Sequence, residues 1–482
     1  MTTRFILFGA ALLACCSKAG EGDMTSDAGE IAHYAGDDRY KSYEENPFLS
    51  TGDYPVSTFS VDADGASYAN ALRFVNEGRP VPAASVRVEE YLNYFAYDYP
   101  EPAPGEEVSL QAELFACPWA PGHRLLRVGL KGRHVADGEL PAANLVFLID
   151  VSGSMTPADR LPLLKEGFSR MVDGARPVDR VAIVTYGGRA GVSLPSTPCT
   201  EKAKIKAAIA SLGTKGATAG AAGIAKAYQV ALDNFVPGGN NRVILGTDGD
   251  FNVGLSSTRE LVDMIKEKRA SGVYLTVLGV GRGNLNDEMM EQLADNGNGN
   301  YEYIGDAGQL HKIFTEERAK FYTVARDCKV QLTFDTARVE SYRLIGYENR
   351  LLAPGQFDDD REDAGEIGVN QTVTALYELL PRDASPGASP ARLEARYKSG
   401  AQALSRLVAL DVPGLAAGEP SAESRFAAAV AGAGLLLKRS IYKGGLTWGL
   451  VSSLARDATA FDPGGHRTAF CRMVDRAASM NL

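Results

Sequence analysis

Between residues 142 and 322 the spacing of apolar residues switches repeatedly between two patterns. Runs in which almost every residue is apolar, such as residues 144–149, indicate strands that are buried on both faces of a sheet. Between these runs, apolar residues recur every three or four positions, as in amphipathic helices; Leu161, Leu164 and Phe168 are one example. The alternation predicts a doubly wound α/β domain over residues 142–322. Its strands are expected at residues 144–149, 180–186, 241–245, 273–278 and 301–304.

The segments on either side of this domain alternate apolar and polar residues, which indicates strands with one buried face. Because such strands occur both before and after the α/β domain, we expect them to pair into one β-sandwich, into which the α/β domain is inserted. Helices are expected at residues 67–77 and 86–95, and again from about residue 421 onward. The flanking strands are expected at residues 108–115, 124–130, 330–334, 341–345, 371–377 and 391–397.

The N-terminus has the features of a bacterial lipoprotein signal. Arg4 precedes an apolar stretch, residues 5–14, that has signal-peptide length and is too short to span a bilayer as a helix. The stretch ends in Leu-Leu-Ala-Cys15, which resembles a lipobox, so acyl chains on Cys15 are expected to anchor the protein. Cys16 is a weaker candidate, and a plain cleaved signal is the alternative. Residues 16–45 are rich in small and acidic residues and predict a disordered tether.

Together these patterns divide the chain into a signal peptide, a tether, an N-terminal α+β region, the α/β domain, a β-sandwich region and a C-terminal helical region. After the signal, no apolar stretch reaches transmembrane length, and residues 426–437 are short and broken by glycine, which favours a buried helix. The predicted boundaries, in order, are residues 1–15, 16–45, 46–141, 142–322, 323–415 and 416–482.

Composition limits the partners and the metal chemistry. The formal net charge is −10 and no run is rich in Lys or Arg, which argues against nucleic acid as a partner, because phosphate binding needs a basic face. Four cysteines lie beyond the lipobox, widely spaced and without a C-x-x-C pair, which argues against a cysteine metal cluster. Disulfides and buried free thiols remain equal alternatives for them. These cysteines are Cys117, Cys199, Cys328 and Cys471.

Oxygen-bearing side chains follow two of the buried strands. Asp150, Ser152 and Ser154 form a D-x-S-x-S sequence after the first strand, Thr218 precedes a predicted helix, and Asp248 follows a later strand. In a doubly wound sheet, ligands bind beyond the carboxyl ends of the strands, so these residues are expected to converge. Carboxylate and hydroxyl oxygens suit a hard dication, which predicts Mg²⁺, with Mn²⁺ or Ca²⁺ as alternatives. Because few of these ligands are charged, the ion would keep enough positive charge to accept an Asp or Glu carboxylate from a partner protein.

The set D-x-S-x-S, Thr and Thr-Asp-Gly resembles the metal-ion-dependent adhesion site of von Willebrand factor A-type (VWA) domains. One departure is Ala217, where such proteins more often carry a second small hydroxyl residue. Over most of the mature chain, further segments resemble bacterial VWA-containing lipoproteins, in which a conserved N-terminal region precedes the VWA unit and a C-terminal region of undefined function follows it. These segments are residues 55–62, 87–95, 343–349 and 363–368.

Several of these residues also have simpler interpretations. Any one of the five predicted ligands could be an ordinary helix cap or turn residue, and only the full set favours a metal. The acidic turn at residues 357–363 could bind Ca²⁺, although a solvated hairpin loop is favoured. The sequence has no P-loop, no G-x-S-x-G and no H-E-x-x-H, so no enzymatic activity is expected.

The sequence therefore predicts a non-enzymatic, lipid-anchored protein of the bacterial cell envelope that grips an acidic partner through a metal. The residue after Cys15 is not Asp, which by resemblance to enterobacterial sorting favours the outer membrane over the inner one. Two alternatives are an envelope scaffold whose metal is structural and an accessory factor to an envelope enzyme complex.

Overall fold

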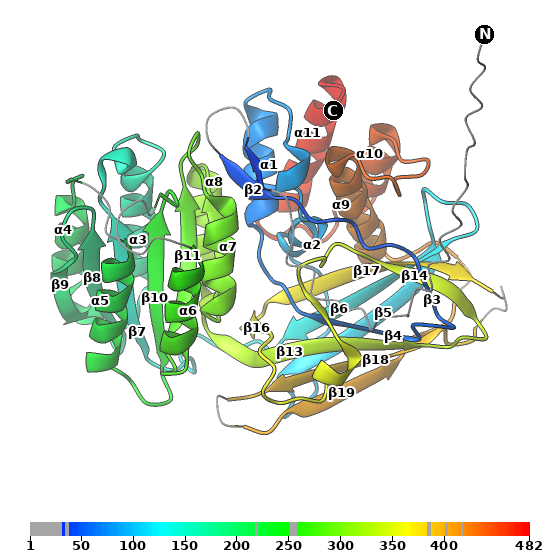
Figure 1. Ribbon diagram of the computed structural model, residues 1–482, viewed down its shortest axis with the longest axis horizontal. Helices are drawn as coiled ribbons and strands as arrows, with labels where there is room; N and C mark the ends of the chain where they lie inside the picture. Colours follow the sequence, from blue (N-terminus) through cyan, green and yellow to red (C-terminus); the bar gives the residue numbers. More distant parts are fainter. Residues whose placement is uncertain are drawn as a thin grey trace, which may run out of the picture.

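The computed structural model describes most of the chain (Figure 1). The predicted signal peptide with Cys15, most of the predicted tether, and Thr218 lie outside the described residues. The described ranges are residues 31–33, 38–216, 220–250, 258–382, 387–400, 403–415 and 418–482.

The predicted α/β domain is a six-stranded sheet with strand order β12-β11-β10-β7-β8-β9, in which β9 pairs antiparallel with β8 and the other pairs are parallel. Along β7, Phe147 and Ile149 pack with helices α3 and α4, whereas Val146 and Leu148 pack with α5, α6 and α7. Helices therefore cover both faces, which explains the uninterrupted apolar run. The strands are β7 (Ala143–Asp150), β8 (Arg180–Tyr186), β9 (Gly191–Pro198), β10 (Asn240–Thr247), β11 (Tyr274–Val280) and β12 (Tyr301–Ile304). The helices are α3 (Leu161–Gly174), α4 (Lys202–Ser211), α5 (Gly220–Asp233), α6 (Thr258–Arg269), α7 (Asp287–Asn296) and α8 (Ala307–His311).

The flanking segments form the predicted β-sandwich, and each of its two sheets combines strands from before and after the α/β domain. In one sheet, β4 (Val56–Ser60) pairs with β13 (Thr323–Phe334); in the other, β6 (Arg124–Gly132) pairs with β17 (Thr372–Pro381). These pairings confirm that the α/β domain is inserted into the sandwich (Figure 1). The remaining strands are β3 (Leu49–Ser50), β5 (Val108–Ala116), β14 (Val339–Ile345), β15 (Leu351–Leu352), β16 (Gly365–Gly368), β18 (Ala391–Lys398) and β19 (Arg406–Asp411).

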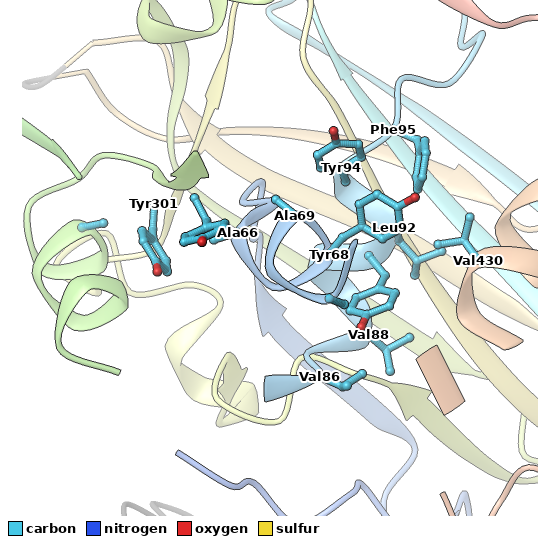
Figure 2. Packing of buried hydrophobic residues seen from close by; sticks show 14 of the residues in the cluster. Ala66, Tyr68, Ala69, Val86, Val88, Leu92, Tyr94, Phe95, Tyr301 and Val430 are labelled. Atoms are coloured by element: carbon cyan, nitrogen blue, oxygen red, sulfur yellow. The ribbon is translucent and has the colours of Figure 1, made fainter. Parts of the chain in front are cut away.

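The helical regions pack together although the sequence separates them widely. One apolar cluster runs from strand β12 through helices α1 and α2 to the C-terminal helices. Figure 2 shows helix α1, with Ala66 and Ala69, lying between Tyr301 of β12 and Val430 of α9. The three parts of the molecule therefore share a continuous core. The helices are α1 (Ala66–Asn76), α2 (Val88–Asn93), α9 (Ala422–Lys438), α10 (Trp448–Arg456) and α11 (His466–Ser479).

The predicted tether over residues 16–45 is wrong for residues 38–45, which belong to the folded unit. Strand β2 (Arg39–Lys41) pairs with β1 (Ile31–His33), and Tyr40 is fully buried. Hydrogen bonds join this segment to the α/β domain, because the Leu285 amide donates to the Asp38 carboxylate at 2.9 Å and the Arg39 amide donates to the Leu285 carbonyl at 2.8 Å. The segment resembles a linker in composition, but the strand pairing and these hydrogen bonds hold residues 38–45 in the folded unit.

Two further sequence alternatives find an answer in the described structure. Cys117, Cys199, Cys328 and Cys471 are free, and burial raises the pKa of the Cys199 thiol to about 11. In the acidic turn, Asp358 forms an ion pair with Arg396 at 2.6 Å. A side chain of the protein thus offsets part of the negative charge of the turn, which favours the solvated-loop interpretation over a Ca²⁺ site.

Helix α2 buries a carboxyl group without hydrogen bonds. Glu89 is fully buried, and neither of its oxygens has a hydrogen-bond partner within the described chain. Burial, with the nearby charges of Glu348 and Asp62, raises the pKa of Glu89 from 4.5 to about 8. A carboxyl group with a raised folded-state pKa stabilises the fold below its unfolded pKa, and this contribution is lost as the pH rises through the folded value.

We therefore expect Glu89→Gln to be less sensitive to pH than the wild type. Between pH 4.5 and about 8, the wild type should lose stability relative to the variant by on the order of 4 kcal/mol, because only the wild type must ionise a buried group. Urea unfolding at several pH values measures this difference. The exposed Glu340→Gln variant is the control, and parallel pH profiles for wild type and Glu89→Gln would contradict the prediction.

Candidate metal centre

The D-x-S-x-S loop turns sharply at the carboxyl end of the central strand β7. Asp150, the last residue of the strand, is fully buried, and its Oδ1 accepts a hydrogen bond from the Ser152 amide at 2.8 Å. This bond bends the chain so that the Oγ atoms of Ser152 and Ser154 lie 2.9 Å apart. The loop therefore places one carboxylate and two hydroxyls at a single point, as the sequence predicts.

The neighbouring strand β10 brings a second carboxylate to the same edge. The Thr247 hydroxyl donates to Oδ2 of Asp150 at 3.3 Å, which ties the two strand ends together. Asp248 follows and is fully buried, and its Oδ1 accepts a hydrogen bond from the Asp250 amide at 3.2 Å. Asp150, Ser152, Ser154 and Asp248 are thus gathered as predicted.

The loop that leads to Thr218 also reaches the site, although Thr218 itself lies outside the described residues. The Lys215 amide donates to the Val151 carbonyl at 2.5 Å, and the Gly153 amide donates to the Gly216 carbonyl at 3.3 Å. Gly187, from the loop after β8, has a φ of +132° and lies so close that a Cβ there would be 2.5 Å from the Ser152 amide nitrogen. Only glycine permits this approach.

Two polar residues that sequence analysis missed hold Asp248 in place. Arg160, just before helix α3, donates from Nη1 to Oδ2 of Asp248 at 2.7 Å and to the Ser154 carbonyl at 2.8 Å. Asn284 donates to the same Oδ2 at 3.1 Å and accepts from Arg160 at 2.6 Å. No sequence motif marks Arg160 or Asn284. Their partner Asp248 is distant along the chain, and Arg and Asn are ordinary residues before a helix and in a loop.

The charges at the site are unevenly balanced. Asp248 has the guanidinium of Arg160, whereas the hydrogen-bond partners of Asp150 are the neutral groups of Ser152, Thr247 and Tyr186. Burial raises the pKa of Asp150 to about 6, the bonds from Ser152 lower it, and the charge of Asp248 raises it again. A buried carboxylate without a cation is costly.

This donor set fits a hard dication. An ion at the site would supply the positive charge that Asp150 lacks, and the adjacent serine hydroxyls are oxygen ligands of the kind that Mg²⁺ accepts. Within the described ranges, no cluster of three or more His, Cys, Asp or Glu residues could hold a metal. A metal here would therefore depend on hydroxyl oxygens as much as on carboxylates.

Three protein families match successive parts of the chain. Residues 144–316 match the von Willebrand factor type A domain family, residues 34–127 match a family described as von Willebrand factor, and residues 319–480 match the C-terminal family of the uncharacterized protein YfbK. The uncharacterized protein YfbK of Escherichia coli K12 is 39% identical over 468 residues, which cover 91% of this chain and 81% of YfbK. A UPF0353 protein of Mycolicibacterium paratuberculosis is 30% identical over 154 residues, or 30% of this chain and 45% of that protein.

Among solved structures, a von Willebrand factor type A protein from Catenulispora acidiphila aligns with a TM-score of 0.47 at 18% identity, over 76% of this chain and 89% of that one. The pilus adhesin SpaC from Lactobacillus rhamnosus GG aligns with a TM-score of 0.32 at 14% identity, over 67% of this chain and 50% of that one. Across the part of the chain that the structure describes, no helix is both long enough and apolar enough to cross a membrane.

Proposed function

Because this chain belongs to the YfbK family of bacterial proteins with a VWA domain, we propose that it binds a partner protein through a divalent cation held at the carboxyl ends of strands β7 and β10. VWA domains are typically metal-dependent protein-interaction modules, which supports this proposal. The observation that carries it is the convergence of Asp150, Ser152, Ser154 and Asp248, with one buried carboxylate lacking a cation.

Each residue has a distinct task in this proposal. The hydroxyls of Ser152, Ser154 and Thr218 would hold the ion, and Asp150 and Asp248 would supply negative charge directly or through water. Bound Mg²⁺, or Mn²⁺ or Ca²⁺ in its place, would offer an open coordination position to an Asp or Glu of the partner. Arg160 neutralises Asp248, so the site as a whole stays short of negative charge and can accept a foreign carboxylate.

We also propose that the protein acts at the cell envelope, by binding and not by catalysis. The lipobox ending at Cys15 supports a lipid anchor, and the residue that follows it favours the outer membrane, with the folded part facing the periplasm or the exterior. Nucleic acid is not proposed as a partner, because the net charge is −10.

Capture of partners without crosslinking tests this function. Partners recovered in Mg²⁺ should be lost in EDTA, and equally lost with the Asp150→Ala variant in Mg²⁺. Asp173→Ala, an exposed aspartate on helix α3, is the matched control and should recover the same partners as the wild type. Recovery of the same partners with and without EDTA would overturn the proposal and favour the scaffold alternative.

Asn284 offers a second test, because it positions Asp248 without being a proposed ligand. Asn284→Ala removes the hydrogen bonds to Asp248 and Arg160, and we expect the affinity for Mg²⁺ to fall by about tenfold, as for other residues that orient metal ligands. Calorimetric titration with Mg²⁺ measures this effect, with Asn234→Ala as a control from the end of helix α5. An unchanged affinity would show that Arg160 alone suffices to hold Asp248.

A further inference from the structure

A cavity of about 470 Å³ lies where the three parts of the molecule meet, and none of its lining residues belongs to the metal centre. The end of the VWA domain contributes Glu302 and residues 312–320, the N-terminal region contributes residues 93–98, and the C-terminal region contributes residues 461–467. The size is that of a pocket for a small molecule or a few residues of a peptide. Its chemistry comes from the side chains that face it.

One wall of the cavity carries a hydroxyl group without a partner. Tyr94 lines the cavity and is 8% exposed, and its hydroxyl makes no hydrogen bond to any described residue. Its ring packs with Tyr68 and Phe95, and Figure 2 shows the hydroxyl pointing away from them, out of the packed cluster. The hydroxyl is not among the fully buried polar atoms, so it is open to the cavity, where a ligand can bond to it in place of water.

The lysines in the wall are already neutralised by the protein. Lys312 pairs with Glu317, and Lys320 pairs with both Glu302 and Glu317; the two lysine side chains are only 5% and 8% exposed. Burial raises the pKa of Glu317, but the two lysines outweigh it and lower that pKa to about 2, so the carboxylate stays ionised beside them. These four groups cancel, and they give the cavity no positive charge for an anion.

The charged groups with more access to water are mainly acidic. Glu316 is 30% exposed and lies near two imidazoles, His466 at 2.7 Å and His311 at 3.5 Å, which offset its charge only when they are protonated. Asp98 is exposed, and Asp462 accepts hydrogen bonds from the backbone amides of Arg467 and Thr468. The other cations of the wall are taken, because Lys131 pairs with Glu101 and Arg467 with Glu423. The cavity therefore has a surplus of negative charge.

From this arrangement we propose that the cavity binds a cationic amine or guanidinium group, separately from the metal centre. Glu316, with Asp98 and Asp462, would attract and pair with the cation, and the Tyr94 hydroxyl would accept a hydrogen bond from it. The group can come from a free small amine or from a basic side chain of a polypeptide.

Matched probes test the charge requirement on the full chain in EDTA, which keeps the metal centre out of the measurement. N-acetyl-arginine amide should bind with one-to-one stoichiometry and at least about tenfold more tightly than N-acetyl-citrulline amide, its neutral counterpart of the same shape. Cadaverine distinguishes the two sources: tighter binding of cadaverine supports a free amine, and tighter binding of the blocked arginine supports a polypeptide. Calorimetry reports both affinity and stoichiometry.

Two variants locate the site and leave the fold intact. Tyr94→Phe keeps the ring and should weaken binding by about threefold to tenfold, and Glu316→Gln keeps the size of a partly exposed side chain and should weaken it by about tenfold. Glu166→Gln on the surface of helix α3 is the control and should bind as the wild type does. Equal binding of the arginine and citrulline probes, no binding of either cation at millimolar concentration, or unchanged affinity in both variants would overturn the proposal.

Discussion

Replacing Arg87 with methionine is expected to lower the free energy of unfolding by about 3–5 kcal/mol, because it leaves a group of buried carboxylates without their cation. Arg87 is 2% exposed, and its guanidinium pairs with Glu90, with Asp287 at 2.6 Å and with Glu291 at 3.3 Å. Each of these partners is also buried. Because Asp287 and Glu291 belong to helix α7 and Glu90 to helix α2, the substitution also breaks one of the polar links between the VWA domain and the N-terminal region.

Urea unfolding near neutral pH measures this loss, with Arg456→Met as the control. Arg456 pairs with Asp475 on the protein surface, where an ion pair contributes about 0–1 kcal/mol. In Arg87→Met the unpaired carboxylates should have raised folded-state pKa values, so the deficit should shrink as the pH falls and the folded protein takes up protons. A deficit no larger than that of Arg456→Met would show that these carboxylates do not depend on Arg87.

The five parallel strands of the α/β domain could be predicted because they are buried on both faces, whereas the antiparallel edge strand β9 was missed because most of its side chains are at least partly exposed. An uninterrupted apolar run leaves little choice of structure, and the strands expected at residues 180–186 and 301–304 coincide with β8 (Arg180–Tyr186) and β12 (Tyr301–Ile304). Strand β19 was missed because it lies at a sheet edge with most of its side chains exposed, so its sequence lacks a strong apolar pattern. The apolar pattern that predicts a strand comes from burial of its side chains, so an exposed strand has only a weak pattern.

The helical spacing of His311, Phe314 and Phe321 in the sequence predicts one helix at the end of the α/β domain, and this prediction is only partly correct. These residues keep helical spacing and all three positions are helical, but α8 ends at His311 and continues as a π-helical turn and a separate 3₁₀ turn. Apolar spacing shows which side chains face the core, and it does not distinguish one continuous helix from several short ones. The lysines of this segment, Lys312 and Lys320, turn inward to buried carboxylates, which no surface-helix pattern predicts.

Of the candidate site, the carboxylates and hydroxyls could be predicted and the residues that hold them could not. Asp150, Ser152 and Ser154 are close in sequence and follow a strong strand, so topology alone brings them to the sheet edge. Arg160 and Asn284 act through bonds to a loop distant in sequence, and pattern analysis has no means of pairing them. Most proposed ligands can be found from short sequence motifs, but the residues that position and neutralise Asp248 are brought to it only by the tertiary structure.

The Asp150→Asn variant separates a metal-binding role of this residue from a structural one. In EDTA we expect the variant to be at least as stable as the wild type, because the amide keeps nearly the same shape and can still accept from the Ser152 amide, while one of two buried negative charges is gone. In Mg²⁺ the order should reverse. An ion that binds only the folded wild type stabilises it by about 2.7 kcal/mol at a concentration a hundred times Kd, and the variant should gain little.

Thermal melts of both proteins, with and without Mg²⁺, measure this reversal, and Asp173→Asn on the surface of helix α3 should follow the wild type. If Mg²⁺ raises the midpoint of Asp150→Asn as much as that of the wild type, the ion binds elsewhere and the proposed metal centre is wrong. If Mg²⁺ stabilises only the wild type but partner capture survives EDTA, the metal tightens the fold without touching the partner. The residues of the site are then correct, and the scaffold interpretation replaces metal-bridged binding.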